Sequence, residues 1–117
     1  EIVEGISKTY RTRYELECKC RNTLLSNDPK MTEMIRDVGT QVVGEKNILD
    51  KDISVMLGED FSEFSNRVPS TVIFVGVGNK TKGTDYPHHH PKFNIDEEAL
   101  AIGVEIHVRS ALEYLNN

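Results

Sequence analysis

Residues 71–77 read TVIFVGV, a continuous apolar run rich in β-branched residues, and residues 80–93 that follow read KTKGTDYPHHHPKF. A run of this kind and length is typical of a strand that is buried on both faces of a sheet. The second stretch combines Gly and Pro with three consecutive histidines, which predicts a loop. We therefore expect an α/β fold in which helices pack on a sheet and a histidine-rich loop follows one strand.

Helical patterns lie on both sides of this strand and loop. Residues 1–10 carry apolar side chains at helical spacing. Asp28 followed by Pro29 predicts a helix start, because Asp can cap free backbone N–H groups and Pro has the backbone angle of a first helical position. An apolar stripe follows over residues 31–42. A long final helix is expected from Asp96 onward, with one main apolar face and a second stripe that together predict more than one packing neighbour.

Three shorter segments complete the pattern. Residues 12–20 alternate between charged and apolar side chains, which predicts a half-buried strand. Residues 53–57 form a short apolar run that we interpret as a short strand. Residues 61–68 suggest a short helix that ends before Pro69, because the residue before a proline is disfavoured in helices. Gly44 is a helix stop signal at the end of the earlier helix.

The composition excludes several classes of protein. The chain has 117 residues, 38% of them apolar and 28% charged, and a net charge of −5. These values are typical of one folded domain, and an acidic chain argues against nonspecific binding of nucleic acid. No apolar run approaches the roughly 18 residues of a membrane span. The chain has neither a signal peptide nor a starting Met, so we expect Glu1 to open a piece of a larger protein.

Cys18 and Cys20 would lie side by side on one face of the predicted strand. They could form a metal or redox pair, or they could be two small half-buried residues of a reduced protein. We favour the second interpretation because the chain has no further cysteine to complete a site. It also leads us to expect a cytoplasmic location.

The histidine cluster is the strongest local signal for chemistry. Neutral imidazole is a common ligand of transition metals near neutral pH. Adjacent histidines on a loop cannot all reach one ion, so one or two of residues 88–90 would bind it. Pro87 and Pro91 restrict the backbone on both sides and would hold a ring in place. The alternative is a solvated polar loop, and the local residues alone leave both interpretations open.

Glu59 and Asp60 follow Gly58 at the end of an apolar run. Carboxylates at the carboxyl end of a strand lie where open α/β sheets bind ligands. They are equally suited to cap the helix that begins near Phe61, and from these residues alone we favour capping. His107 lies inside the final helix and is interpreted as a structural histidine. The sequence has no phosphate-binding loop, dinucleotide fingerprint or serine-hydrolase signature.

Several motifs become specific when they are taken together in their order and spacing. They are MLGEDF at residues 56–61, VP at 68–69, IFVG at 73–76, GTDYPHHHPKF at 83–93 and DEEAL at 96–100. In this combination the chain resembles the metal-dependent amidohydrolase and peptidase family of aminoacylases, hippurate hydrolases and auxin-conjugate hydrolases. The resemblance covers essentially the whole chain and identifies it as the C-terminal part of such a protein.

The resemblance implies a two-part architecture. Members of that family have a zinc-peptidase-like α/β catalytic domain and an inserted α/β lid domain that mediates dimerisation. By resemblance, residues 1–22 are the last helix and strand of the lid, and residues 23–117 are the C-terminal part of the catalytic domain. A homo-oligomer is expected for the same reason.

The resemblance also implies roles for single residues. The family's loop usually reads Tyr-Pro-Leu-His-Ser/Asn-Pro, and its histidine binds metal. That position is His89 here, while His88 replaces the Leu and His90 replaces the Ser or Asn. His90 is expected to contact substrate or water, and Glu59 and Asp60 to lie beside the metal site. The family usually has Gly where this chain has Leu57, so the backbone of that neighbourhood differs.

The implied reaction is hydrolysis of the amide bond of an N-acyl amino acid or small peptide. Two divalent metal ions (Zn, Mn, Co or Ni) would activate a water molecule, and a glutamate would act as general base. The base and the other ligands are expected upstream of Glu1. No catalytic residue is therefore assigned here, and the chain alone is expected to be inactive, with or without bound metal. The alternative is a non-catalytic folded fragment or assembly module that binds at most a single metal ion through the histidine loop.

Overall fold

The computed structural model describes residues 1–19, 23–49 and 55–116. The helices of these segments are α1 (Ile2–Tyr10), α2 (Pro29–Val43), η1 (Glu45–Asn47), α3 (Ser62–Ser65), η2 (Lys80–Lys82) and α4 (Glu98–Asn116). The predicted helices at the start, after Asp28, near Phe61 and at the end of the chain are thereby confirmed. None of the described helices is both long and apolar enough to cross a membrane.

Local signals account for the bounds of α2. The Asp28 carboxylate accepts a hydrogen bond from the Met31 N–H at 3.0 Å, so it caps the helix as predicted. Pro29 occupies the first turn. At the other end, Gly44 has a φ of 81° and donates its N–H to the Thr40 carbonyl at 2.9 Å. A residue with a side chain is strained at such a φ, which is why glycine ends the helix here.

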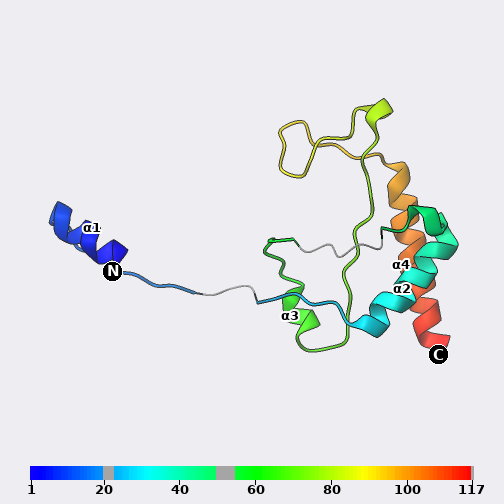
Figure 1. Cartoon of the computed structure of the whole chain (residues 1–117), viewed down its shortest axis with the longest axis horizontal. Coiled ribbons are helices and arrows are strands. Elements are labelled where there is room, and N and C mark those ends of the chain that lie inside the picture. The colour runs from blue at the N-terminus through cyan, green and yellow to red at the C-terminus, as the bar shows by residue number, and fades with distance from the viewer. Residues whose placement is uncertain (20–22, 50–54, 117) are drawn as a thin grey trace.

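The largest packed unit is the pair formed by α2 and α4, which lie side by side in Figure 1. Its buried apolar side chains are Val38 from α2 and Ala99 and Ile106 from α4. The second apolar stripe of α4 is therefore the one that meets α2. The main apolar face, which includes Val104 at 64% exposure, stays open to solvent. We expected α4 to pack on more than one neighbour. Besides α2, the Val75 side chain from the extended segment lies close to Gly103 of α4, but no second helix packs against α4 in the described residues.

Residues 71–77 are extended but form no strand in the described part of the chain. Their backbone is held instead by one side chain. Asn27 donates its Nδ2 to the Val72 carbonyl at 2.9 Å and accepts the Val72 N–H on Oδ1, also at 2.9 Å. The amide of Asn27 thus replaces the backbone of a neighbouring strand over one residue.

The predicted strands therefore remain without a sheet in the described segments. Residues 12–19 and 55–57 have no regular secondary structure. The other residues of those two predicted strands, Cys20 and residues 53–54, lie outside the described part. A strand exists only where a second strand pairs with its backbone. No described segment supplies that pairing for residues 71–77, so the sheet of the predicted α/β fold stays a prediction.

The shape of the molecule is open. Figure 1 shows α1 and the extended residues after it lying apart from the remainder of the chain. The radius of gyration is 20.5 Å, whereas a compact domain of 100 residues has about 13 Å. The accessible surface is 10514 Å², against about 6,500 Å² for a compact monomer of this mass. Much apolar surface is therefore not buried within this chain. The division into lid and catalytic parts stays a prediction.

Candidate metal-binding loop

The two ends of the histidine-rich loop lie close together and are joined by hydrogen bonds. Thr84 donates its N–H to the Asn79 carbonyl at 3.0 Å, and Asn79 donates its own N–H to Thr84 Oγ1 at 3.0 Å. Asp96 then donates its N–H to the Val77 carbonyl at 2.9 Å. Residues 85–95 accordingly form a closed loop between η2 and α4, the yellow loop of Figure 1.

Charged groups reinforce the base of the loop. The Asp96 carboxylate accepts from Lys82 Nζ at 2.7 Å on Oδ1 and from Asn79 Nδ2 at 2.7 Å on Oδ2. Lys82 also contacts Glu98 at 2.9 Å. Hydrogen bonds from Lys82 and Asn79 hold the pKa of Asp96 below its ordinary value. Hydrogen bonds to Asp96 and Glu98 raise the pKa of Lys82. Lys82 and Asp96 are therefore both charged at neutral pH.

His89 occupies a strained position at the tip of a turn. His90 donates its N–H to the Pro87 carbonyl at 3.2 Å, which closes the turn with His88 and His89 at its centre. The φ of His89 is 66°, in the left-handed region. Among the described residues with side chains, only Arg11 shares this feature, and it merely ends α1. Such a backbone costs about 1–2 kcal/mol for a residue with a side chain. Strain of this kind clusters at functional sites.

The ring of His90 is fixed by its neighbours within the loop. It stacks on Tyr86 with ring centroids 4.6 Å apart and an interplanar angle of 13°. Its Nδ1 accepts the Lys92 N–H at 3.1 Å. The Lys92 ammonium lies 5.7 Å from the centroid of the Tyr86 ring, a cation–π distance. His90 is thus oriented by two contacts, and its Nε2 is the ring nitrogen without a hydrogen-bond partner in the described residues.

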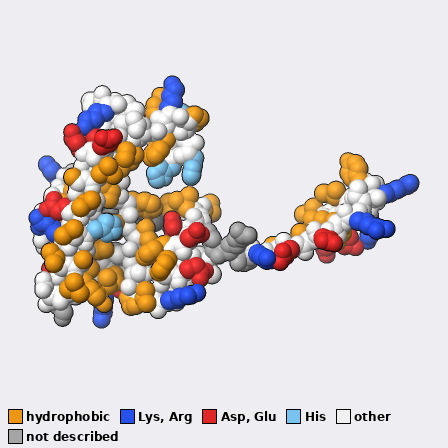
Figure 2. Space-filling view, turned by 180° about the vertical axis from the view of Figure 1, so that it is seen from behind, with side chains coloured by type: hydrophobic (Ala, Val, Ile, Leu, Met, Phe, Trp, Pro, Cys, Tyr) orange, Lys and Arg blue, Asp and Glu red, His pale blue; other side chains and the backbone are white. Residues whose placement is uncertain are grey.

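His88 and His89 differ from His90 and from each other. The His88 ring packs edge-on against Phe93, with centroids 4.9 Å apart. The His89 ring has an edge contact with His88 at 6.2 Å. Neither nitrogen of His89 takes part in a hydrogen bond within the described residues, and the side chain is exposed. Of the three rings, that of His89 is the least engaged by the protein. Figure 2 shows the loop histidines (pale blue, upper centre) beside a hollow in the surface.

Glu59 and Asp60 lie in the exposed segment just before α3. Glu59 Oε1 accepts the Phe61 N–H at 3.2 Å, so this carboxylate binds the turn just before α3, while α3 itself has no side-chain cap. Figure 1 places this segment on the same side of the α2–α4 pair as the loop. No hydrogen bond or ion pair joins it to residues 85–95 in the described part of the chain. The substrate or metal-shell roles of Glu59 and Asp60 stay predictions.

The described residues contain no group of three or more His, Cys, Asp or Glu side chains that could hold a metal ion. The structure therefore does not bring His89, Glu59 and Asp60 together into one centre. His89 fits the requirement for a single ligand, because its imidazole is exposed and takes part in no hydrogen bond within the described residues. Cys18 is exposed, and Cys20 lies outside the described residues.

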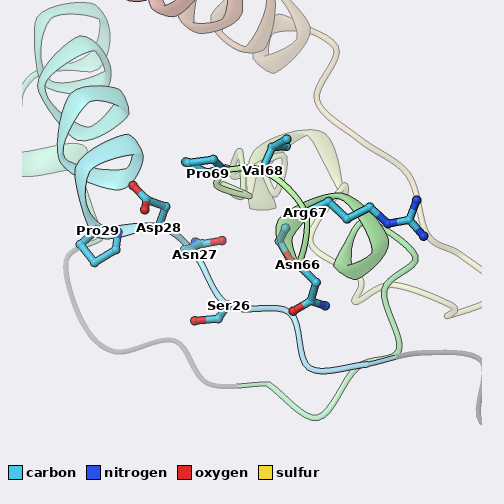
Figure 3. Close-up of a pocket in the computed structure, with 9 residues that line it drawn as sticks. Ser26, Asn27, Asp28, Pro29, Asn66, Arg67, Val68 and Pro69 are labelled. Atoms are coloured by element: carbon cyan, nitrogen blue, oxygen red, sulfur yellow. The ribbon is translucent and has the colours of Figure 1, made fainter.

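A pocket lies elsewhere, between residues 26–29 and 65–69, with a volume of about 430 Å³. Its polar groups already have structural partners. Asp28 caps α2, Asn66 donates to oxygens of residues 23, 24 and 62, and Arg67 pairs with a glutamate of α3. Figure 3 shows the Arg67 side chain directed away from Asp28. These polar groups do not converge on a common point. We therefore interpret the pocket as a gap between two packed segments and assign no ligand to it.

Sequence patterns do not identify the residues that attach the histidine loop and the extended residues 71–77 to the rest of the protein. They indicate Asp96 only as a helix start and give no role to Asn79 or Asn27. Asn79 also caps η2, because its Oδ1 accepts from the Thr81 N–H at 3.1 Å. An Asn just before a short polar turn is the signal that could have identified it. No local signal identifies Asn27 as a partner of Val72, which is 45 positions away.

Comparison with known proteins assigns nearly the whole chain to one protein family. The family described as Peptidase family M20/M25/M40 matches residues 3–113. A relative from Saccharolobus solfataricus, "Thermostable carboxypeptidase 1", is 31% identical over 77% of this chain and 22% of its own length. "Putative amidohydrolase YhaA" of Bacillus subtilis is 27% identical over 97% of this chain and 28% of its own length. "IAA-amino acid hydrolase ILR1-like 4" of Arabidopsis thaliana is 30% identical over 76% and 20%.

The chain thus spans less than a third of the length of these curated relatives. No solved structure matches it significantly. The family match nevertheless runs through every motif quoted above, from residue 3 in the opening helix to residue 113 in α4. The resemblance read from the sequence is confirmed: the chain belongs to the M20/M25/M40 peptidase family, a family of hydrolases that includes amidohydrolases.

Proposed function

We propose that this chain is the C-terminal part of a metal-dependent amidohydrolase that cleaves an N-acyl amino acid or a small peptide. In this proposal His89 is one ligand of a two-metal centre, and the other ligands and the general base come from residues that precede this segment in the full-length protein. Family membership supports the hydrolase class, and relatives named amidohydrolase and IAA-amino acid hydrolase support an amide substrate.

The observation that carries the proposal is the conformation of His89. Its backbone has a φ of 66°, and its imidazole has no hydrogen-bond partner in the described residues. A loop gains nothing in stability from a histidine in the left-handed region, because glycine adopts this conformation without strain. A ligand histidine explains the cost, since the His89 side chain is exposed and can reach an ion outside the loop.

The neighbouring residues suit supporting roles. His90 is held by Tyr86 and by the Lys92 N–H, so it can present Nε2 to a substrate oxygen or to water in a fixed direction. Glu59 and Asp60 would approach from the segment on the same side of the α2–α4 pair. A bound pair of divalent ions (Zn, Mn, Co or Ni) would supply Lewis-acid activation of water and of the amide carbonyl.

The 117-residue chain alone is proposed to be inactive. A catalytic zinc site typically has about three protein ligands per ion, and one histidine cannot hold two ions. The lack of a three-residue ligand group in the described segments also favours a second candidate. In that candidate the chain is a non-catalytic assembly module that binds at most one metal ion through the loop. Homo-oligomerisation and a cytoplasmic location are proposed for the full-length protein.

Two measurements on the chain test these proposals. Incubation with N-acetyl or N-benzoyl amino acids and added Zn²⁺, Mn²⁺ or Co²⁺ should release no amino acid. Release above a metal-only control would show that the segment contains a complete site. Titration with Co²⁺, followed by visible absorption, should detect weak binding that is lost in His89→Ala and kept in His88→Ala. Equal effects of the two variants would place the ligand at another histidine of the loop.

A further inference from the structure

Within the described part of the chain, the loop that carries His89 is attached to the protein through its base. Among the described residues, the hydrogen bonds and ring contacts of residues 85–95 are made within that segment. Examples are the turn from His90 to Pro87 and the stack of His90 on Tyr86. These contacts give the loop an internal shape. They do not orient it relative to α2, α3 or α4, so its orientation depends on the residues at its two ends.

Asp96 is the centre of that attachment. Its carboxylate binds Lys82 and Asn79 through separate oxygens, at 2.7 Å each, and its N–H donates to the Val77 carbonyl. The Asp96 side chain is only 14% exposed. Hydrogen bonds between charged groups at this distance are of the strong kind. By contrast, the Glu98 side chain is 84% exposed, so its ion pair with Lys82 contributes little to the stability of the loop base.

The three side chains link both ends of the loop. Asn79 and Lys82 precede it, and Asp96 follows it and begins the approach to α4. If Asp96 lost its carboxylate, the Asn79 amide and the Lys82 ammonium would each lose a partner, and the two loop ends would keep backbone hydrogen bonds and the exposed contact between Lys82 and Glu98. A small rotation at the base moves the tip, where His89 lies, by a larger distance.

We propose that Asn79, Lys82 and Asp96 form a positioning clasp that holds the histidine loop in the orientation in which His89 binds metal. The three side chains contact one another at the base of the loop. They act through the loop, so they are positioning residues. The proposal rests on the proposed role of His89, but the orientation and order of the loop can be measured without metal.

The test compares Asp96→Ala and Asp96→Asn with Glu105→Gln in the 117-residue chain. Glu105→Gln removes a carboxylate that pairs with Arg109 at 2.6 Å on the same helix, away from the loop, and is the matched control. Far-ultraviolet circular dichroism checks that α2 and α4 remain folded. Amide ¹⁵N relaxation reports the order of residues 85–95, and Co²⁺ titration reports the ligand site.

The expected result is a rise in fast motion across residues 85–95 in Asp96→Ala, with helical content unchanged. Co²⁺ affinity should fall about tenfold, the lower end of the range for groups that support a metal ligand. Asp96→Asn keeps one acceptor oxygen and should recover part of both losses. Glu105→Gln should behave as the unsubstituted chain does.

The outcomes separate the clasp from the role of His89. Unchanged relaxation in Asp96→Ala would overturn the clasp, whatever the Co²⁺ titration gives. Increased motion together with Co²⁺ binding that His89→Ala does not alter would keep the mechanical clasp and reject His89 as the ligand. Loss of helical content in Asp96→Ala shifts the decision to Lys82→Met. This variant removes the Lys82 ammonium and leaves Asp96 itself in place before α4, and an unaltered loop in it would also overturn the proposal.

Discussion

The Lys82 ammonium lies 2.7 Å from Asp96 Oδ1 and joins the two ends of the loop that carries three consecutive histidines. The pair is 14 positions apart in sequence. It lies at the junction between η2 and α4, where the Asn79 side chain also binds Asp96 and Lys82 also contacts Glu98. The charge states of Lys82 and Asp96 are therefore expected to affect how firmly the loop holds His89 in position.

The first prediction concerns the pH dependence of this pair. The folded-state pKa of Asp96 is lowered, so its contribution is present above the unfolded value of about 3.9 and is lost as pH falls through the folded value. The folded-state pKa of Lys82 is raised, so its contribution is present below about 10.4 and is lost as pH rises through the folded value.

We therefore expect the loop to be most ordered between about pH 4 and pH 10. Amide ¹⁵N relaxation of residues 85–95 should show increasing motion on acidification below that window. In Asp96→Asn the acid-dependent change should be much smaller, because the titrating carboxylate is gone. A wild-type loop whose order does not change between pH 7 and pH 3 would contradict the prediction.

The second prediction separates strain from ligation at His89. Glycine tolerates a φ of 66°, whereas alanine does not, so His89→Gly should be more stable than His89→Ala by about 1 kcal/mol. Both variants lack the imidazole and should lose Co²⁺ binding to the same extent. Urea unfolding followed by NMR signals of the loop measures the difference. Equal stability of the two variants would indicate that the turn relaxes out of the left-handed conformation.

A third prediction tests the start of α2. Asp28→Ala removes the side chain that caps the helix at Met31 and should lower stability by about 1 kcal/mol. Asp37→Ala, on an exposed position in the middle of the same helix, is the control and should have a much smaller effect. Thermal unfolding monitored at 222 nm compares them. Similar losses in both variants would show that the Asp28 carboxylate does not act as a cap.

The fourth prediction concerns self-association. The open face of α4 includes Val104 and Val108, which are 64% and 54% exposed. Exposed apolar surface of this extent favours association, so the 117-residue chain should elute above its monomer mass in size-exclusion chromatography. Val104→Lys with Val108→Lys should shift it toward monomer, while Glu105→Gln should not. A single monomer peak across a wide concentration range would rule out this role for the face.

Short-range patterns predicted the helices correctly because their causes are local. Asp28, Pro29 and Gly44 define α2 through contacts within one turn. The final helix begins at Glu98, two residues after the predicted start. Asp96 instead accepts from the Glu98 N–H at 3.3 Å, so it serves the helix from just outside while binding Lys82. The histidine loop was also recognised, because Gly and Pro exclude regular structure.

Tertiary contacts decided what local patterns could not. An apolar run such as residues 71–77 specifies a tendency to extend, but a sheet requires a second backbone in register, and Asn27 pairs with only one residue of it. The φ of His89 results from how the closed loop fits between Pro87 and His90. The partners of Asp96 lie 14 and 17 positions away.

The sequence by itself therefore determined the family, the main helices and the candidate ligand, because motif order and helical periodicity are properties of neighbouring residues. Only the tertiary structure decided that α2 covers the Ile106 stripe of α4 and that Asp96 closes the histidine loop. Those arrangements depend on distances between segments far apart in the chain. Such distances are set by packing and by paired charges, neither of which is encoded in any single stretch of residues.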